Sequence, residues 1–308
     1  MSSNYCQVSL AVFQKELLPG RDINPKLLSS MLHIEEDPDG EYFAFVRHSN
    51  SLAASCSQRF YFKVRKVNQI LRLAKTGLVA KDLIAWYEAA GNGRGYQPAV
   101  AFYPTDEYAE KTYDLPPSME KDAQIRETSK DLVARCCYNR MAAALDLRHS
   151  DDECAFGMEP DSPLLPDTLG AIESRTRFEH SVAQIMSHQH RTHVFMFYLE
   201  PGKYARVFRW DRSGAVATPP LSFETDLGDL WNIIYRLACA DKATQGFDPT
   251  VSLATYPELR KLQEFHRPED EDLYEYRIMF WEYFYDHPMY KVRTSQICVL
   301  KSLQNCSR

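Results

Sequence analysis

The strongest constraint on the fold is a continuous apolar run from Thr192 to Leu199, in which β-branched and aromatic residues predominate. A short run of this kind predicts a strand that is buried on both faces. Pro201 and Gly202 follow and predict a type II turn, because proline presets the second position and glycine takes the positive φ of the third. The chain is therefore expected to reverse direction directly after this strand.

The segment 204–210 alternates in side-chain type and predicts a second strand beside the first. Its two faces are expected to carry Ala205 and Val207 on one side, and Tyr204, Phe208 and Trp210 on the other. The tetrapeptide Asp211-Arg212-Ser213-Gly214 then predicts a type I turn, with Asp first and Gly last. Asp, Arg and Ser stand together here, but consecutive turn residues point in different directions, so we interpret this segment as structural rather than catalytic.

The same region resembles a known family. The matching segments are Gln189-His190-Arg191-Thr192, Tyr204-Ala205-Arg206 and Arg209-Trp210-Asp211-Arg212-Ser213-Gly214-Ala215-Val216. They resemble a block in the amino-terminal half of the fungal-type protein kinases, and Gly246-Phe247-Asp248-Pro249-Thr250-Val251 resembles that family's next landmark. The resemblance is specific over 176–251 and looser over 96–174. For the whole family it implies ATP-dependent protein phosphorylation.

The parts that carry out phosphoryl transfer are missing from these 308 residues. A kinase uses a Gly-rich loop, a strand lysine, an H-R-D loop and a D-F-G aspartate. Val299-Leu300-Lys301 superficially resembles the strand lysine, but no Gly-rich loop precedes it. We therefore expect a non-catalytic or truncated binding module with no catalytic, cofactor or metal residues. MgATP is expected only with a kinase core, and the end at Arg308 is either natural or an artefact of gene prediction.

Composition narrows the setting of the chain. A chain of 308 residues with 44% hydrophobic content predicts a sizeable core and about two domains. The net charge of −6, without a block of basic residues, gives no strong nucleic-acid signal. The sequence lacks a secretory signal and an apolar run of membrane-spanning length, and its eight scattered cysteines form no C-x-x-C pair. We expect an intracellular protein, cytoplasmic or nuclear, with reduced thiols and an unknown protein partner.

The order of the remaining patterns predicts four segments. They are a mainly helical segment 1–95, an α/β sheet domain 96–224, a helical extension 225–265, and an acidic linker with an aromatic tail 266–308. Helices are expected over 8–18, 25–32, 63–76, 78–90, 172–189, 227–238 and 256–264, with Gly77 as a break and Thr225 as an N-cap. Strands are expected over 42–47 and 98–104, with a strand or helix end over 142–148 and a hinge at 91–95.

The order strand, strand, helix, apolar strand, alternating strand is similar to the core of nucleases that carry the PD-(D/E)-x-K motif. On this alignment Pro98-Ala99 replaces Pro-Asp, and Asp146-Leu147-Arg148 replaces Glu-x-Lys. Ala99 offers no oxygen ligand for Mg²⁺, and Arg148 stays protonated and cannot act as a base. We therefore expect a mixed α/β sheet with a degenerate nuclease-like core. The alternative is a Mg²⁺-dependent nuclease with a migrated site, which needs Asp151, Asp152 or Glu173 beside Asp146.

Four histidines fall close together: His180, His188, His190 and His193. The spacing His188-x-His190-x-x-His193 permits a zinc hypothesis, but these residues straddle a helix end and a strand start, so their side chains need not converge. We instead favour a capping or hydrogen-bonding role for His190 and Arg191. A contact of Arg191 with Asp211 or Trp210 is the alternative.

Overall fold

The computed structural model describes residues 4–32, 64–75, 77–83, 97–115, 132–147, 154–200 and 203–253. It also describes Thr255, Pro257, Glu258 and Arg260, and the pieces 290–293 and 298–301. The strand expected over 42–47, the turn at 201–202, the hinge at 91–95 and the second half of the helix expected over 78–90 lie outside these ranges.

One mixed sheet joins nine of the described strands in the order β1-β8-β7-β6-β5-β3-β2-β4, with β9 paired to β7. The strands are β1 (Asn4–Gln7), β2 (Leu78–Leu83), β3 (Val100–Pro104), β4 (Val133–Ala134), β5 (Ala143–Leu147), β6 (His193–Glu200), β7 (Tyr204–Asp211), β8 (Gly214–Ala217) and β9 (Leu221–Ser222). The pairs β1–β8, β2–β4 and β5–β6 are parallel, and the remaining pairs are antiparallel. The expected mixed α/β fold is confirmed at this level.

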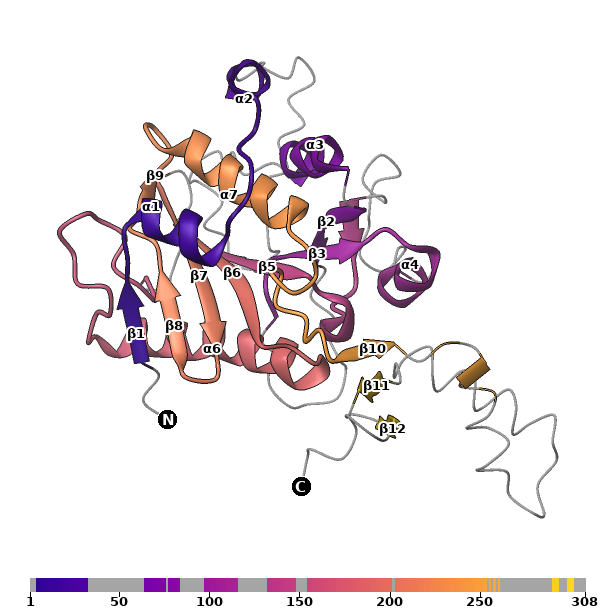
Figure 1. Cartoon of the computed structure of the whole chain (residues 1–308). Helices are drawn as coiled ribbons and strands as arrows, with labels where there is room; N and C mark the ends of the chain where they lie inside the picture. Colours follow the sequence, from indigo (N-terminus) through magenta and orange to yellow (C-terminus); the bar gives the residue numbers. More distant parts are fainter. Residues whose placement is uncertain are drawn as a thin grey trace.

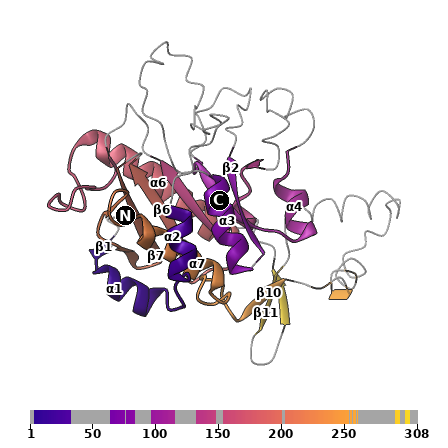
Figure 2. The same cartoon turned by 90° about the horizontal axis from the view of Figure 1, so that it is seen from above.

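Helices cover both faces of the sheet (Figure 1). One face carries α1 (Leu10–Val12) with the π-helical turn η1 (Phe13–Leu17), α3 (Val64–Ala74) and α7 (Leu227–Cys239), and α2 (Pro25–Leu32) packs on α7. Figure 2 views this layer from above. The other face carries α6 (Leu169–His188), with α4 (Glu107–Tyr113) and the 3₁₀ turn η3 (Tyr138–Arg140).

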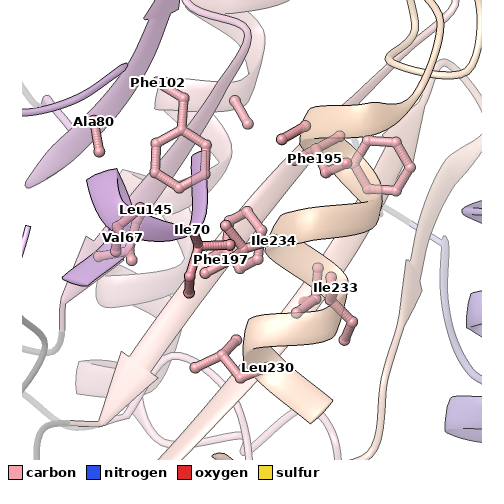
Figure 3. Packing of buried hydrophobic residues seen from close by; sticks show 14 of the residues in the cluster. Val67, Ile70, Ala80, Phe102, Leu145, Phe195, Phe197, Leu230, Ile233 and Ile234 are labelled. Atoms are coloured by element: carbon pink, nitrogen blue, oxygen red, sulfur yellow. The ribbon is translucent and has the colours of Figure 1, made fainter. Parts of the chain in front are cut away.

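The sheet has a hydrophobic core on each face, and strand β6 contributes side chains to both. Every residue of β6 is buried, and its side chains alternate between the faces. Phe195, Phe197 and Leu199 enter the core beneath α3 and α7. Figure 3 shows Phe195 and Phe197 in this core. Val194, Met196 and Tyr198 enter the core beneath α6. The expectation of a strand buried on both faces is confirmed.

The alternation expected for β7 is also confirmed. Ala205 and Val207 lie in the core beneath α3 and α7, whereas Phe208 and Trp210 lie in the core beneath α6. A turn follows where it is expected, because Asp211 pairs with Gly214 across a two-residue loop. The strand 98–104 and the helices at 25–32, 64–74 and 227–239 agree with the elements observed, and 143–147 is a strand.

Three local expectations are wrong. Residues 78–83 form β2 rather than a helix, because β3 and β4 supply hydrogen-bonding partners on both sides. The side chain of Asn68 on α3 also bonds the N–H and the carbonyl of Ala80. Ile172 is 42% exposed, since α6 turns the smaller residues Ala171 and Ser174 inward. The N-cap of α7 is Asp226 rather than Thr225.

The sheet takes strands from both sides of residue 95, because β1 and β2 come from the first expected segment. Helix α7, from the segment 225–265, packs in the same core as α3. A separate antiparallel sheet consists of β10 (Val251–Leu253), β11 (Tyr290–Arg293) and β12 (Cys298–Lys301). Among the described residues, no helix is both long and apolar enough to cross a bilayer.

Candidate functional site

Three of the four segments that carry the resemblance, 189–192, 209–216 and 246–251, have residues in contact where α6 passes into β6. Gln189, which directly follows α6, is 3% exposed and extended in backbone conformation. Its Nε2 group donates hydrogen bonds to the carbonyl oxygens of Tyr138 and Met141, the latter at 2.9 Å. Gln189 therefore joins the end of α6 to the segment that leads into β5.

Arg191 is the centre of this meeting point. Its guanidinium donates to Gln189 Oε1 (2.9 Å), to the carbonyl of Gln245 (2.8 Å) and to the carbonyl of Met141 (2.7 Å). The plane of the group also lies over the ring of Phe247, at 3.8 Å from the ring centroid. The side chain is only 4% exposed, so its charge is compensated by neutral carbonyl dipoles and an aromatic face.

The loop 241–248, which joins α7 to β10 (orange in Figure 1), closes the other side. Its backbone pairs with the 190–192 segment. Thr192 N–H donates to the carbonyl of Gly246 (2.9 Å), and Asp248 N–H donates to that of His190 (3.1 Å). Gly246 has φ +99°, and a Cβ there would lie 1.9 Å from the carbonyl oxygen of His193. The close approach explains in physical terms why a glycine stands at this landmark.

His193 links the loop to β7. Its Nε2 lies 2.9 Å from the carbonyl oxygen of Thr244, and its Nδ1 lies 3.1 Å from Nη2 of Arg209. Arg209 in turn pairs with Asp211 at 3.2 Å. Burial lowers the pKa of His193; the charges of Arg209 and Arg191 act in the same direction, whereas the bond to Thr244 and the charge of Asp211 oppose them. His193 is therefore expected to be neutral at pH 7.

We name this set the polar junction: Gln189, Arg191, His193, Arg209, Asp211 and the loop 241–248. Its donors are directed mainly at backbone carbonyls, which fixes one segment against another. The hydrogen-bonding role expected for Arg191 is confirmed. In place of the alternative partners, Arg191 engages Phe247 and Gln245; Trp210 packs edge-on against Tyr5.

The histidines do not form the hypothetical zinc site. His188 is exposed, and its Nδ1 lies 2.8 Å from the carbonyl of Gln184 within its own helix. His193 instead directs its ring to the loop 241–248. Among the residues that the structure describes, no group of three or more His, Cys, Asp or Glu side chains is arranged to hold a metal ion.

Of the positions aligned with the nuclease motif, Ala99 directly precedes β3, and Asp146 lies in the neighbouring strand β5. Ala99 N–H donates to the carbonyl of Leu145 at 2.9 Å, which places Ala99 beside the end of β5, where Asp146 lies. Ala99 is buried and contributes a methyl group. Glu173 is exposed on α6, whereas Arg148, Asp151 and Asp152 lie outside the described residues. Within those residues Asp146 belongs to no group of three or more His, Cys, Asp or Glu side chains that could hold a metal ion.

A second buried cation, Arg206, is missed by the sequence reasoning. It is 1% exposed, and its guanidinium donates to the carbonyls of Gly157 (2.6 Å) and Thr218 (2.7 Å) and to Gln7 Oε1 (2.7 Å). Burial lowers the pKa of Arg206 to about 10. The feature of the sequence that could have indicated its burial is the position of this arginine on the face of β7 that carries Tyr204, Phe208 and Trp210.

No family model, curated protein or solved structure matches this chain. The polar junction and the residues that form it are therefore the basis for a functional proposal.

Proposed function

We propose that this chain is a non-catalytic binding or regulatory module related to the amino-terminal accessory region of the fungal-type protein kinases. The observation that carries the proposal is the convergence of three separate segments of the resemblance in one junction. Arg191, Arg209 and Gly246 come from different segments, and all three lie at this junction. A resemblance that arose by chance would not be expected to select residues that meet in space.

The chemistry of the junction favours a scaffold over a catalyst. Arg191 and His193 are buried and engaged with backbone carbonyls, so neither is presented to a substrate. In the adjoining turn, Asp211 accepts hydrogen bonds from the N–H and the hydroxyl of Ser213, which is the local bonding of an Asx turn. Phosphoryl transfer needs groups that hold Mg²⁺ and phosphates, and the sequence supplies none of the family's versions.

The first experiment tests for catalysis. The purified chain is incubated with MgATP and a mixture of protein substrates, and phosphate transfer is measured beside an active kinase. We expect no autophosphorylation and no substrate phosphorylation. ATP-dependent transfer that is lost on replacing Lys301 with Met would overturn the proposal.

The second experiment tests for binding. The catalytic domain of a fungal-type kinase, supplied as a separate protein, is mixed with the chain, and complex formation is followed by analytical ultracentrifugation. We expect a complex, together with a change in the kinase rate, since a regulatory module acts on the part that it accompanies in the family. Absence of both effects across several such domains counts against the proposal.

A second candidate is a Mg²⁺-dependent nuclease. Its support is the element order α3-β2-β3-β5-α6-β6, in which β5 and β6 are parallel and Ala99 lies beside the end of β5. The missing oxygen at Ala99 weighs against it. A plasmid-nicking assay with and without Mg²⁺ separates the two candidates. We expect no cleavage; Mg²⁺-dependent nicking that Asp146→Ala abolishes would favour the nuclease.

A further inference from the structure

The hydrogen-bonding partners of the two ring nitrogens determine which nitrogen of His193 carries the proton. Its Nδ1 lies 3.1 Å from Nη2 of Arg209, and a guanidinium nitrogen has only N–H donors, so Nδ1 must accept. Its Nε2 lies 2.9 Å from the carbonyl oxygen of Thr244, which only accepts, so Nε2 must donate. Both bonds form together only in the neutral imidazole that carries its proton on Nε2.

Protonation of His193 removes one of these bonds. A proton on Nδ1 would point at the N–H groups of Arg209 and place a positive charge beside that guanidinium. The charged groups around the ring are Arg191 from the preceding segment and Arg209 and Asp211 from β7. Asp211 already accepts from Arg209 and Ser213. The loop 241–248 contributes the Thr244 carbonyl, and the ring of Phe195 packs edge-on against the imidazole.

An alternative acceptor for the new proton lies within reach. Thr192 Oγ1 is 3.0 Å from Nδ1, and its hydroxyl donates to the carbonyl of Gly246 at 3.3 Å. In the protonated state the chain of bonds would run from Nδ1–H to Thr192 Oγ1 and on to Gly246. Arg209 would lose its acceptor on the ring and keep its contact with Asp211, which is 33% exposed.

We propose that His193 is a proton-sensitive switch in the polar junction. Neutral His193 holds Arg209 of β7 and the loop 241–248 in one arrangement. Protonated His193 keeps its bond to Thr244 but releases Arg209 toward solvent, which alters the surface around the β7–β8 turn. The inference concerns the junction itself and holds whether or not the chain accompanies a kinase.

The direct test is nitrogen-15 NMR of the histidine rings in the full chain. At neutral pH we expect His193 in the Nε2–H tautomer, with a pKa below the ordinary value of about 6.5. The variant Arg209→Met removes the neighbouring charge and is expected to raise the pKa of His193. Arg212→Met, an exposed arginine in the same turn, is the matched control and should leave it unchanged. A neutral Nδ1–H tautomer, or the same pKa in Arg209→Met and wild type, overturns the proposal.

A second measurement remains informative if Arg209→Met fails to fold. The side-chain nitrogen-15 resonances of Arg209 report its bond to the imidazole. In wild type we expect them to shift as the pH falls below about 6.5 and His193 charges. His193→Asn places an oxygen where Nδ1 accepts and cannot titrate, so the Arg209 resonances should not shift over that range. An equal shift in His193→Asn would contradict the proposal.

Discussion

Gly246 illustrates how one residue without a side chain sets the geometry of the junction. Its φ of +99° is unfavourable for an L-residue, and an added Cβ would lie 1.9 Å from the backbone oxygen of His193. The two nearest atoms are the backbone oxygen and carbon of His193, which cannot move aside as the end of a flexible side chain could. We expect Gly246→Ala to lower the free energy of unfolding by at least about 2 kcal/mol, measured by urea denaturation.

Gly20→Ala is the matched control for this substitution. A Cβ at Gly20 would meet the flexible side chain of Arg236 at an ordinary 3.5 Å. The expected change is within about 0.5 kcal/mol. Equal stability losses in the two variants would mean that the contact between Gly246 and His193 is not a constraint.

Replacing Arg191 with Lys tests whether the planar guanidinium with its several donors, rather than its positive charge, stabilises the polar junction. Arg191→Lys keeps the positive charge but loses the planar contact with Phe247 and two of the three directed donors. The carbonyl of Met141 keeps the bond from Gln189, but that of Gln245 loses the donor that Arg191 provides. We expect a loss of about 2–4 kcal/mol in unfolding free energy, against no more than about 0.5 kcal/mol for exposed Arg212→Lys.

At the scale of the element, the β7–β8 turn depends on an ionised Asp211. Partial burial opposes ionisation, but hydrogen bonds from Ser213 and Arg209 outweigh it and hold the pKa of Asp211 below its ordinary value. The stabilisation is therefore complete above the unfolded pKa of about 3.9 and is lost as pH falls through the lower folded pKa. We expect Asp211→Ala to cost about 1 kcal/mol at pH 7, since three hydrogen bonds at a partly exposed turn are lost.

The pH dependence of the unfolding free energy distinguishes the contribution of the Asp211 charge from that of side-chain packing in this turn. The stability difference between wild type and Asp211→Ala should shrink below about pH 4, because protonation then removes the charge of the wild-type carboxyl. Urea midpoints at a series of pH values measure it. Exposed Asp161→Ala serves as the control and should match wild type throughout. A difference that persists unchanged in acid would assign the effect to packing.

The elements also show how far sequence reasoning reaches. The continuous apolar run predicts β6, and the period-2 pattern predicts β7 and its two faces; both strands lie between two packed layers. Residues 78–83 do not follow their helical spacing, since partners on β3 and β4, distant in sequence, override local preference. For α6 the long side chain of Ile172 suggests the wrong face. The small residues Ala171 and Ser174 allow the helix close to the sheet.

The sequence predicts only those features of the polar junction that depend on residues close together in the chain. The helix end before β6 predicts a hydrogen-bonding role for Arg191, and Gly246 stands out as a landmark. What the sequence does not give is that these two lie together, because Arg191 and Gln245 are more than fifty residues apart. Arg206 is likewise invisible, since its acceptors lie on segments near residues 7, 157 and 218.

At the scale of the whole molecule, the two cores share their middle layer. Strands β6 and β7 each send alternate side chains into both cores, so neither core can be lost while those strands keep their order. The strands β1 and β2 and the helix α7 belong to the same assembly as the strands of 96–224, although the sequence pattern places them in two other segments. Shared strands predict one cooperative unfolding transition for this part of the chain.

Two native tryptophans report the two cores separately. Trp210 lies in the core beneath α6, and Trp231 of α7 lies in the opposite core. Two variants, each keeping one of these and replacing the other three tryptophans with Phe, isolate the signals. In each variant we expect the fluorescence midpoint in urea to coincide with that of far-UV circular dichroism, because unfolding of either core removes the support of β6. A Trp231 transition that precedes the circular dichroism change would instead show that the α7 layer separates from a surviving sheet, and that the division near residue 225 is a true domain boundary.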